Sequence, residues 1–199
     1  MIVILIIMMM TQVGNISSLF RYKEKGQIEE ISNQLLGMID EEKTNALLGK
    51  TQKTKISGTE QWKIVRKRSL DISLDAPSNT LSLLSRVNLA DEKEDTYEAD
   101  DIEKNWTLPL LTGSWYDCSL GNQGTKMVNG TNDINTVRID FIGESLALSG
   151  GNGLVLSPLN ASHIVLKITS KSANQEIHID KRTGLTYARP GLPNTVSCN

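Results

Sequence analysis

The fold prediction for this sequence of 199 residues depends on one amphipathic segment, Ser18–Gly49, which reads SLFRYKEKGQIEEISNQLLGMIDEEKTNALLG. It contains no proline, and its apolar residues recur at the i, i+3, i+4, i+7 spacing that places them on one side of an α-helix. Charged residues, Glu42 among them, are assigned to the other side. Gly49, followed by polar residues, predicts the C-terminal cap. The residues expected to pack this helix on a sheet are Ile28, Ile31, Leu35, Met38, Ile39 and Leu47.

The residues before this segment are uncharged. Met1–Phe20 contains none of the 21 Lys and Arg or 23 Asp and Glu residues, and Met1–Met10 (MIVILIIMMM) is wholly apolar. Twenty helical residues rise about 30 Å, the thickness of a bilayer core, although polar residues after Met10 make this a marginal span. The residues expected in membrane or filament-core packing are Ile2, Val3, Ile4, Leu5, Ile6, Ile7, Met8, Met9, Met10 and Val13.

Two other interpretations of this start fit less well. A secretory signal peptide needs a basic region before the apolar run and a small-residue cleavage site after it, and neither is present. A buried helix of a soluble domain would show a polar side, which ten consecutive apolar residues do not. A helix that is anchored in a membrane, or packed in the core of a filament, is therefore preferred.

The period changes to that of β-strands after residue 50. Thr80–Asn88 is read as a strand, although Leu81–Val87 could instead be a short helix, and Asp91–Lys104 is read as an acidic loop. The predicted fold class is α+β, a long N-terminal helix packed on an antiparallel β-sheet domain. Its segments are the apolar helix half at 1–20, the amphipathic half at 21–49 and a globular domain at 50–199. The other predicted strands are Gln61–Arg68, Asp71–Leu74, Thr136–Ile142, Leu146–Leu148, Leu154–Ser157, His163–Thr169, Glu176–Asp180 and Leu185–Ala188.

These patterns resemble those of type IV pilin-like proteins, in particular minor pseudopilin H and FimT. Met1–Ile7 resembles the apolar run that follows the family's Phe-Thr-Leu-Ile-Glu start, and Ser18–Leu48 resembles its amphipathic helix. Val137–Phe141 with Gly143 resembles a family strand and turn, and Ile177–Leu185 its closing strand and Thr-Gly turn. The leader and the Phe-Thr-Leu-Ile-Glu segment are absent, so Met1 is interpreted as an internal methionine.

The resemblance implies a minor structural subunit of a type IV pilus or a type II secretion pseudopilus. Its partners would be other pilin or pseudopilin subunits and the bacterial inner membrane. The chain would cross that membrane once, with an extracytoplasmic C-terminal domain, before assembly into a periplasmic or extracellular filament. The alternative is a membrane-tethered extracytoplasmic binding protein with DNA as a candidate ligand. From the FimT side of the resemblance, the candidate DNA contacts are Lys181, Arg182 and Arg189.

Cys118 and Cys198 are the only cysteines, and in an exported protein such a pair predicts a disulfide; the other interpretation is two free thiols. Two cysteines without nearby histidines make a zinc site improbable on chemical grounds. His163 and His178 sit in alternating strand patterns, which favours residues that line a sheet face over a metal pair. No metal, cofactor or small-molecule substrate is expected.

Enzyme motifs are incomplete. Gly49–Thr51 ends like a phosphate-binding loop, but Thr44 stands where its first glycine is required. Gly143–Ala147 lacks the second glycine of a nucleophile elbow. We therefore expect a protein that is not an enzyme.

The net charge of −2 and mean hydropathy of −0.23 describe an average soluble protein and argue against a surface built wholly for nucleic acid. The charges are nevertheless segregated. Lys50–Arg68 has seven basic residues and one acid, for a net charge of +6, and Asp91–Lys104 has eight acids and two lysines, for −6. The preferred interpretation is two solvated surface segments that attract each other. The other is anion binding by the first and calcium binding by Asp91, Asp95, Asp100 and Asp101, without EF-hand spacing.

Overall fold

The computed structural model describes residues 2–56, 59–65, 67–75, 80–87, 97–98, 102–107, 112–152 and 156–199. Within them lie one helix, α1 (Ile2–Leu48), and sixteen strands. The strands of the first half are β1 (Lys50–Ile56), β2 (Thr59–Val65), β3 (Lys67–Asp75), β4 (Thr80–Val87), β5 (Tyr97–Glu98), β6 (Ile102–Thr107) and β7 (Thr112–Asp117). The others are β8 (Thr125–Lys126), β9 (Val128–Asn129), β10 (Asn132–Asp133), β11 (Thr136–Ile142), β12 (Ser145–Gly151), β13 (Ser157–Pro158), β14 (His163–Thr169), β15 (Asn174–Asp180) and β16 (Thr186–Pro190).

The two larger sheets form the body of the protein. One has six strands in the order β13-β12-β11-β3-β4-β6, and the other has five in the order β16-β15-β14-β7-β8. All their pairings are antiparallel. Strand β11 shows why the first sheet has one buried face: Val137, Ile139 and Phe141 alternate with more exposed residues and are buried.

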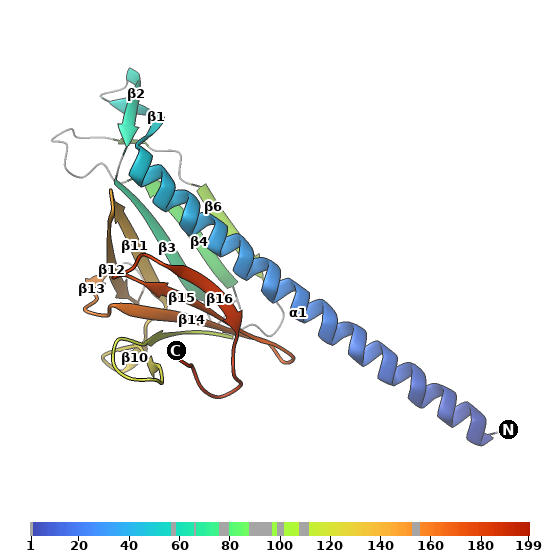
Figure 1. Ribbon diagram of the computed structural model, residues 1–199. Coiled ribbons are helices and arrows are strands. Elements are labelled where there is room, and N and C mark those ends of the chain that lie inside the picture. Colours follow the sequence, from blue (N-terminus) through green and yellow to red (C-terminus); the bar gives the residue numbers. More distant parts are fainter. Residues whose placement is uncertain are drawn as a thin grey trace.

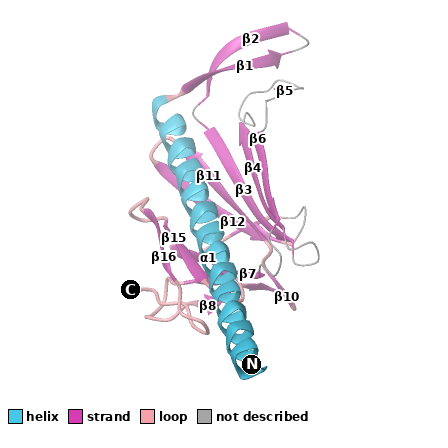
Figure 2. Ribbon diagram, turned by 90° about the vertical axis from the view of Figure 1, so that its right-hand side faces the viewer, coloured by secondary structure: helices cyan, strands magenta, loops and turns pink. Residues whose placement is uncertain are grey.

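Helix α1 joins these sheets into one core (Figures 1 and 2). Its buried residues run from Ile28 to Ala46 and share a single apolar cluster with strands of both sheets. The helix contacts β3 and β11 on one side and β15 and β16 on the other. It ends where the sequence predicts, because Gly49 adopts a positive φ of 70° and its N–H bonds to the carbonyl of Asn45 at 3.0 Å.

The five-stranded sheet is buried on both faces at β14, where every residue from His163 to Ile168 is buried. Ile164, Leu166 and Ile168 belong to the main core. Val165 instead packs with Cys118 and Val196, which form a second small cluster. The C-terminal residues therefore cover the outer face of this sheet.

The predicted fold class, α+β with a long helix packed on one antiparallel sheet, is wrong. The described chain is rich in β-structure, with its strands divided among four sheets. The helical stretch that packs is short, and it contacts two sheets rather than one. The predicted fold class fails in the middle of the chain. There β3, β4 and β6 supply half of the strands of the largest sheet, and β1, β2 and β5 form a separate three-stranded sheet. Leu81–Val87 belongs to strand β4, so the alternative of a short helix there is excluded.

Candidate functional site

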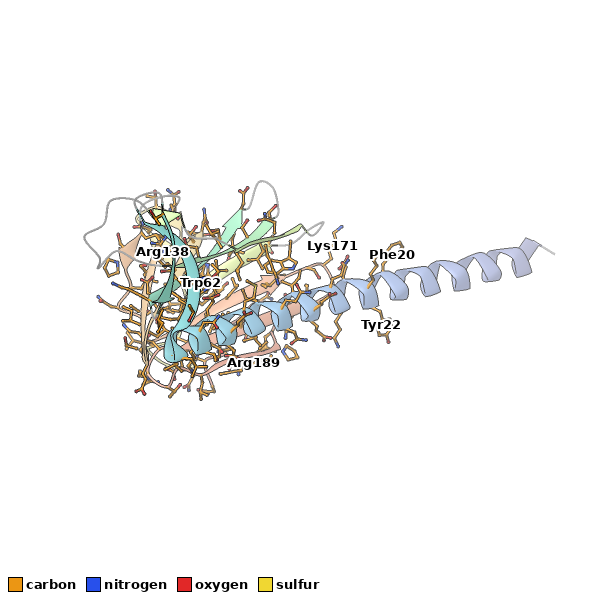
Figure 3. All side chains as sticks on the ribbon, turned by 90° about the horizontal axis from the view of Figure 1, so that it is seen from above. Phe20, Tyr22, Trp62, Arg138, Lys171 and Arg189 are labelled. Carbon is orange, nitrogen blue, oxygen red and sulfur yellow. A yellow bond between two sulfur atoms is a disulfide. The ribbon has the colours of Figure 1, made fainter. Side chains whose placement is uncertain are left out.

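The N-terminal half of α1 projects from the β-sheet body (Figure 1). The side chains of the helix are described from Phe20 onwards, so the predicted packing residues between Ile2 and Val13 lie outside the described side chains. Phe20 and Tyr22 are 62% and 75% exposed, although both are large and aromatic. Figure 3 shows them on the part of the helix beyond the sheets. Exposed aromatic residues next to an uncharged segment are typical of a surface that a partner covers.

Within the part of the chain that the structure describes, no helix combines the length and mean hydropathy that a membrane crossing requires.

The C-terminal half of α1 is held by a buried polar cluster, which we call the Glu42 cluster: Glu42, Arg68 and Ser85. Glu42 Oε1 accepts hydrogen bonds from Ser85 Oγ at 2.8 Å and from Arg68 Nη2 at 3.3 Å, and Oε2 accepts one from Arg68 Nε. The side chains of Glu42 and Arg68 are only 4% and 5% exposed. Since a buried carboxylate needs its cation and its donors, this cluster ties the helix to β3 and β4 in one orientation.

Glu42 is buried, whereas the charge pattern places it on the exposed side of the helix, so that prediction is wrong. It lies seven residues after Leu35 and three after Ile39, so it belongs to the apolar stripe by spacing. Leu47 was predicted to pack but is exposed, whereas the other five predicted packing residues are buried. The stripe ends at Ala46, because the helix leaves the core in its last turn.

Polar contacts also tie the helix to the five-stranded sheet. Lys43 Nζ donates to the Gly184 carbonyl at 2.7 Å, and Thr186 Oγ1 donates to Asp40 Oδ1 at 3.1 Å. Nearer the projecting half, Ser172 Oγ donates to Glu24 Oε2 at 2.6 Å. These contacts are spread over several turns of α1, so the angle at which the helix leaves the body is fixed along its length.

The two histidines form a buried pair on the outer side of the five-stranded sheet. His163 Nε2 and His178 Nδ1 are 3.0 Å apart, and the His178 ring stacks on that of Tyr187 at 4.6 Å. Burial lowers the pKa of His163, and burial, with Arg189 and His163 nearby, lowers the pKa of His178 to about 3. Both are therefore neutral at pH 7. In the described residues no group of three His, Cys, Asp or Glu side chains is arranged to hold a metal ion.

A disulfide and two sets of hydrogen bonds hold the C-terminal residues on the sheet. The expected disulfide joins Cys118 to Cys198. Lys167 is buried, and its Nζ donates to the carbonyls of Leu192, Pro193 and Thr195 at 2.6, 3.1 and 3.0 Å. The guanidinium of Arg189 donates to the carbonyls of Ser197 and Asn199 and lies 3.2 Å from Glu176 Oε2.

The candidate DNA contacts are not brought together. Lys181 and Arg182 are exposed in the turn between β15 and β16, where Arg182 Nε lies 3.5 Å from Asp180. Arg189 stands opposite Glu176, at the other end of the same pair of strands, and is occupied by Glu176 and by backbone carbonyls. The predicted calcium ligands Asp91, Asp95, Asp100 and Asp101 lie outside the described residues.

Two shallow cavities of comparable size open on the described surface. One, of about 260 Å³, lies where α1 leaves the body, and its lining includes Lys25, Glu29, Asn174 and Gly191. The other, of about 250 Å³, lies between the ends of β3 and β7 and is lined by Asp75, Ser114 and Lys126 among others. Neither lining contains a histidine or cysteine.

Comparison with known proteins gives no further guide, because no protein-family model, no curated protein and no solved structure matches this chain.

Proposed function

We propose that this protein is a minor structural subunit of a type IV pilus or type II secretion pseudopilus, held at the bacterial inner membrane before assembly by its N-terminal helix. The observation that carries the proposal is the division of α1. One half is seated between two sheets, and the other half projects from the body with Phe20 and Tyr22 exposed (Figures 1 and 3). The projecting half also contains Ile2–Phe20, which carry no charge.

The physical basis is packing between helices. The run Ile2–Met10 is wholly apolar. Such a helical run is stable in lipid or among similar helices, and exchanging lipid contacts for contacts between helices has little hydrophobic cost. The β-sheet body is then carried outside the bundle of helices. The Glu42 cluster and the contacts of Asp40 and Lys43 keep the body in one orientation relative to the helix. A fixed orientation is what repeated assembly into a filament requires.

Fractionation of cells that express the full chain tests the role of the helix half. Replacing Ile4 and Ile7 together by Asp should release the protein from the membrane fraction, because each buried carboxylate is expensive in hydrocarbon. The control is Leu120→Asp, which introduces one carboxylate at a side chain that is 87% exposed on the sheet body. Unchanged fractionation of the double variant would contradict the proposal.

Cross-linking tests assembly separately. Both native cysteines are joined in the disulfide, so a single introduced cysteine is the only free thiol. Tyr22→Cys should yield cross-linked species in the assembled filament fraction, and Leu120→Cys should not. Equal cross-linking of the two variants would show that the projecting helix is not the packing surface.

A further inference from the structure

A small sheet stands apart from the two that form the body. It contains three strands in the order β2-β1-β5, and Figures 1 and 2 show β1 and β2 beyond the C-terminal end of α1, away from the N-terminus. β1 and β2 are paired along their whole length, from Lys50 opposite Val65 to Ile56 opposite Thr59. Strand β5 pairs with β1 through two residues only.

This hairpin carries two exposed apolar residues on one strand. Trp62 and Ile64 of β2 are 71% and 63% exposed, and Figure 3 labels Trp62 on this strand. They are two residues apart, so they lie on the same face of the strand. A tryptophan and an isoleucine side by side on an edge strand favour aggregation unless something covers them, and tryptophan is the residue most enriched in the centres of binding interfaces.

The second feature is the free edge of the sheet. β2 is the terminal strand in the order β2-β1-β5, so within the described residues its outward N–H and C=O groups face no neighbouring strand. Such an edge binds an extended peptide by continuing the ladder of backbone hydrogen bonds. Side chains beside that edge then provide specificity. Trp62 and Ile64 are placed for this role.

The charge of this small sheet indicates which kind of strand its edge would bind. Lys50–Val65 contains four lysines and one glutamate, a net charge of +3. The strand already bound at its other edge, β5, comes from the acidic segment Asp91–Lys104, and the register sets Glu98 opposite Lys55. This basic hairpin therefore pairs with an acidic strand within its own chain.

We propose that the β2 edge binds an extended acidic segment of a partner protein by antiparallel strand addition, with Trp62 and Ile64 as apolar anchors. The proposal goes beyond the proposed filament function and does not depend on it. A protein strand is favoured over nucleic acid because the lysines do not form an uninterrupted row. In the register Lys55 stands between Glu60 and Glu98, and Lys53 stands opposite Trp62. A nucleic-acid backbone is bound by clustered Lys and Arg, whose charge nearby carboxylates reduce.

The test uses the full chain and a fluorescein-labelled peptide with the sequence of residues 91–104, DEKEDTYEADDIEK, whose net charge is −6. Fluorescence anisotropy should show saturable binding that weakens as salt is raised from 50 to 300 mM. The variant Trp62→Ser with Ile64→Ser should bind at least tenfold more weakly. The control Leu120→Ser, at an apolar residue of the body that is even more exposed, should bind as tightly as the unmodified chain.

A second peptide distinguishes strand pairing from simple charge attraction. Replacing Tyr97 of the peptide by proline keeps its charge but removes a backbone donor, so it should bind at least tenfold more weakly. Equal binding of the two peptides would overturn the proposal. An unchanged affinity of the Trp62/Ile64 variant for the peptide would also overturn it. A third outcome that would overturn it is a single-stranded oligonucleotide that binds more tightly than the peptide and depends on the same two residues.

Discussion

Replacing Glu42 by glutamine should weaken the fold more than any other loss of a single charge among the ion pairs described above. The substitution keeps the size of the side chain but removes the negative charge that faces the Arg68 guanidinium. It also puts an amide donor where one of the two accepting oxygens was. Breaking a buried pair costs about 3–5 kcal/mol, and the retained shape points to the lower end, about 3 kcal/mol. For a chain of this length that loss lowers the melting temperature by roughly 6–12 °C.

Urea unfolding followed by circular dichroism measures this loss. The matched control is Glu29→Gln, which removes the exposed partner of Lys25 at 3.7 Å and should cost less than about 0.5 kcal/mol. A loss for Glu42→Gln that is within about 1 kcal/mol of the control would refute the reasoning. The double variant Glu42→Met with Arg68→Met should lose less free energy of unfolding than the two single variants lose together. Each single variant leaves one buried charge without its partner, and the double variant leaves none.

Three further predictions concern the outer side of the five-stranded sheet. Because the pKa of His178 is lowered to about 3 in the fold, unfolding binds a proton below pH 6.5. The free energy of unfolding should therefore fall between pH 6.5 and pH 3 by up to about 1.4 kcal/mol per unit, and less steeply in His178→Phe. Lys167→Met removes the donor to the carbonyls of Leu192, Pro193 and Thr195 and should speed amide hydrogen exchange in this segment, at Leu192, Asn194 and Thr195; unchanged exchange would contradict its role. Reduction of Cys118–Cys198, 80 residues apart, should cost about 4 kcal/mol in denaturant titrations.

The parts of the fold that the sequence predicted are those in which local pattern and tertiary environment agree. The stripe from Ile28 to Ile39 has a helical period and is buried, and Gly49 ends the helix through a conformation that favours glycine. Strands β11 and β15 alternate apolar with polar residues, β14 contains the apolar run Ile164–Leu166, and all three appear close to the predicted bounds.

The parts that were missed depend on contacts distant in sequence. β1 reads KTQKTKI, which has no apolar alternation, and its hydrogen bonds to β2 and β5 make it a strand. Glu42 was assigned to the exposed side because a carboxylate is normally solvated, and only Arg68 and Ser85, brought from β3 and β4, explain its burial. Arg189 was considered a DNA contact, but Glu176 and the C-terminal carbonyls occupy it. Periodicity does not reveal such partners.

The way in which α1 is fastened has a mechanical consequence. Asp40, Glu42 and Lys43 bond to strands or turns of two different sheets within one turn of the helix. A force that pulls along the helix axis therefore loads these bonds in parallel, as shear, and they must break together rather than in succession. The helix should resist extraction from the body far better than it would on one sheet.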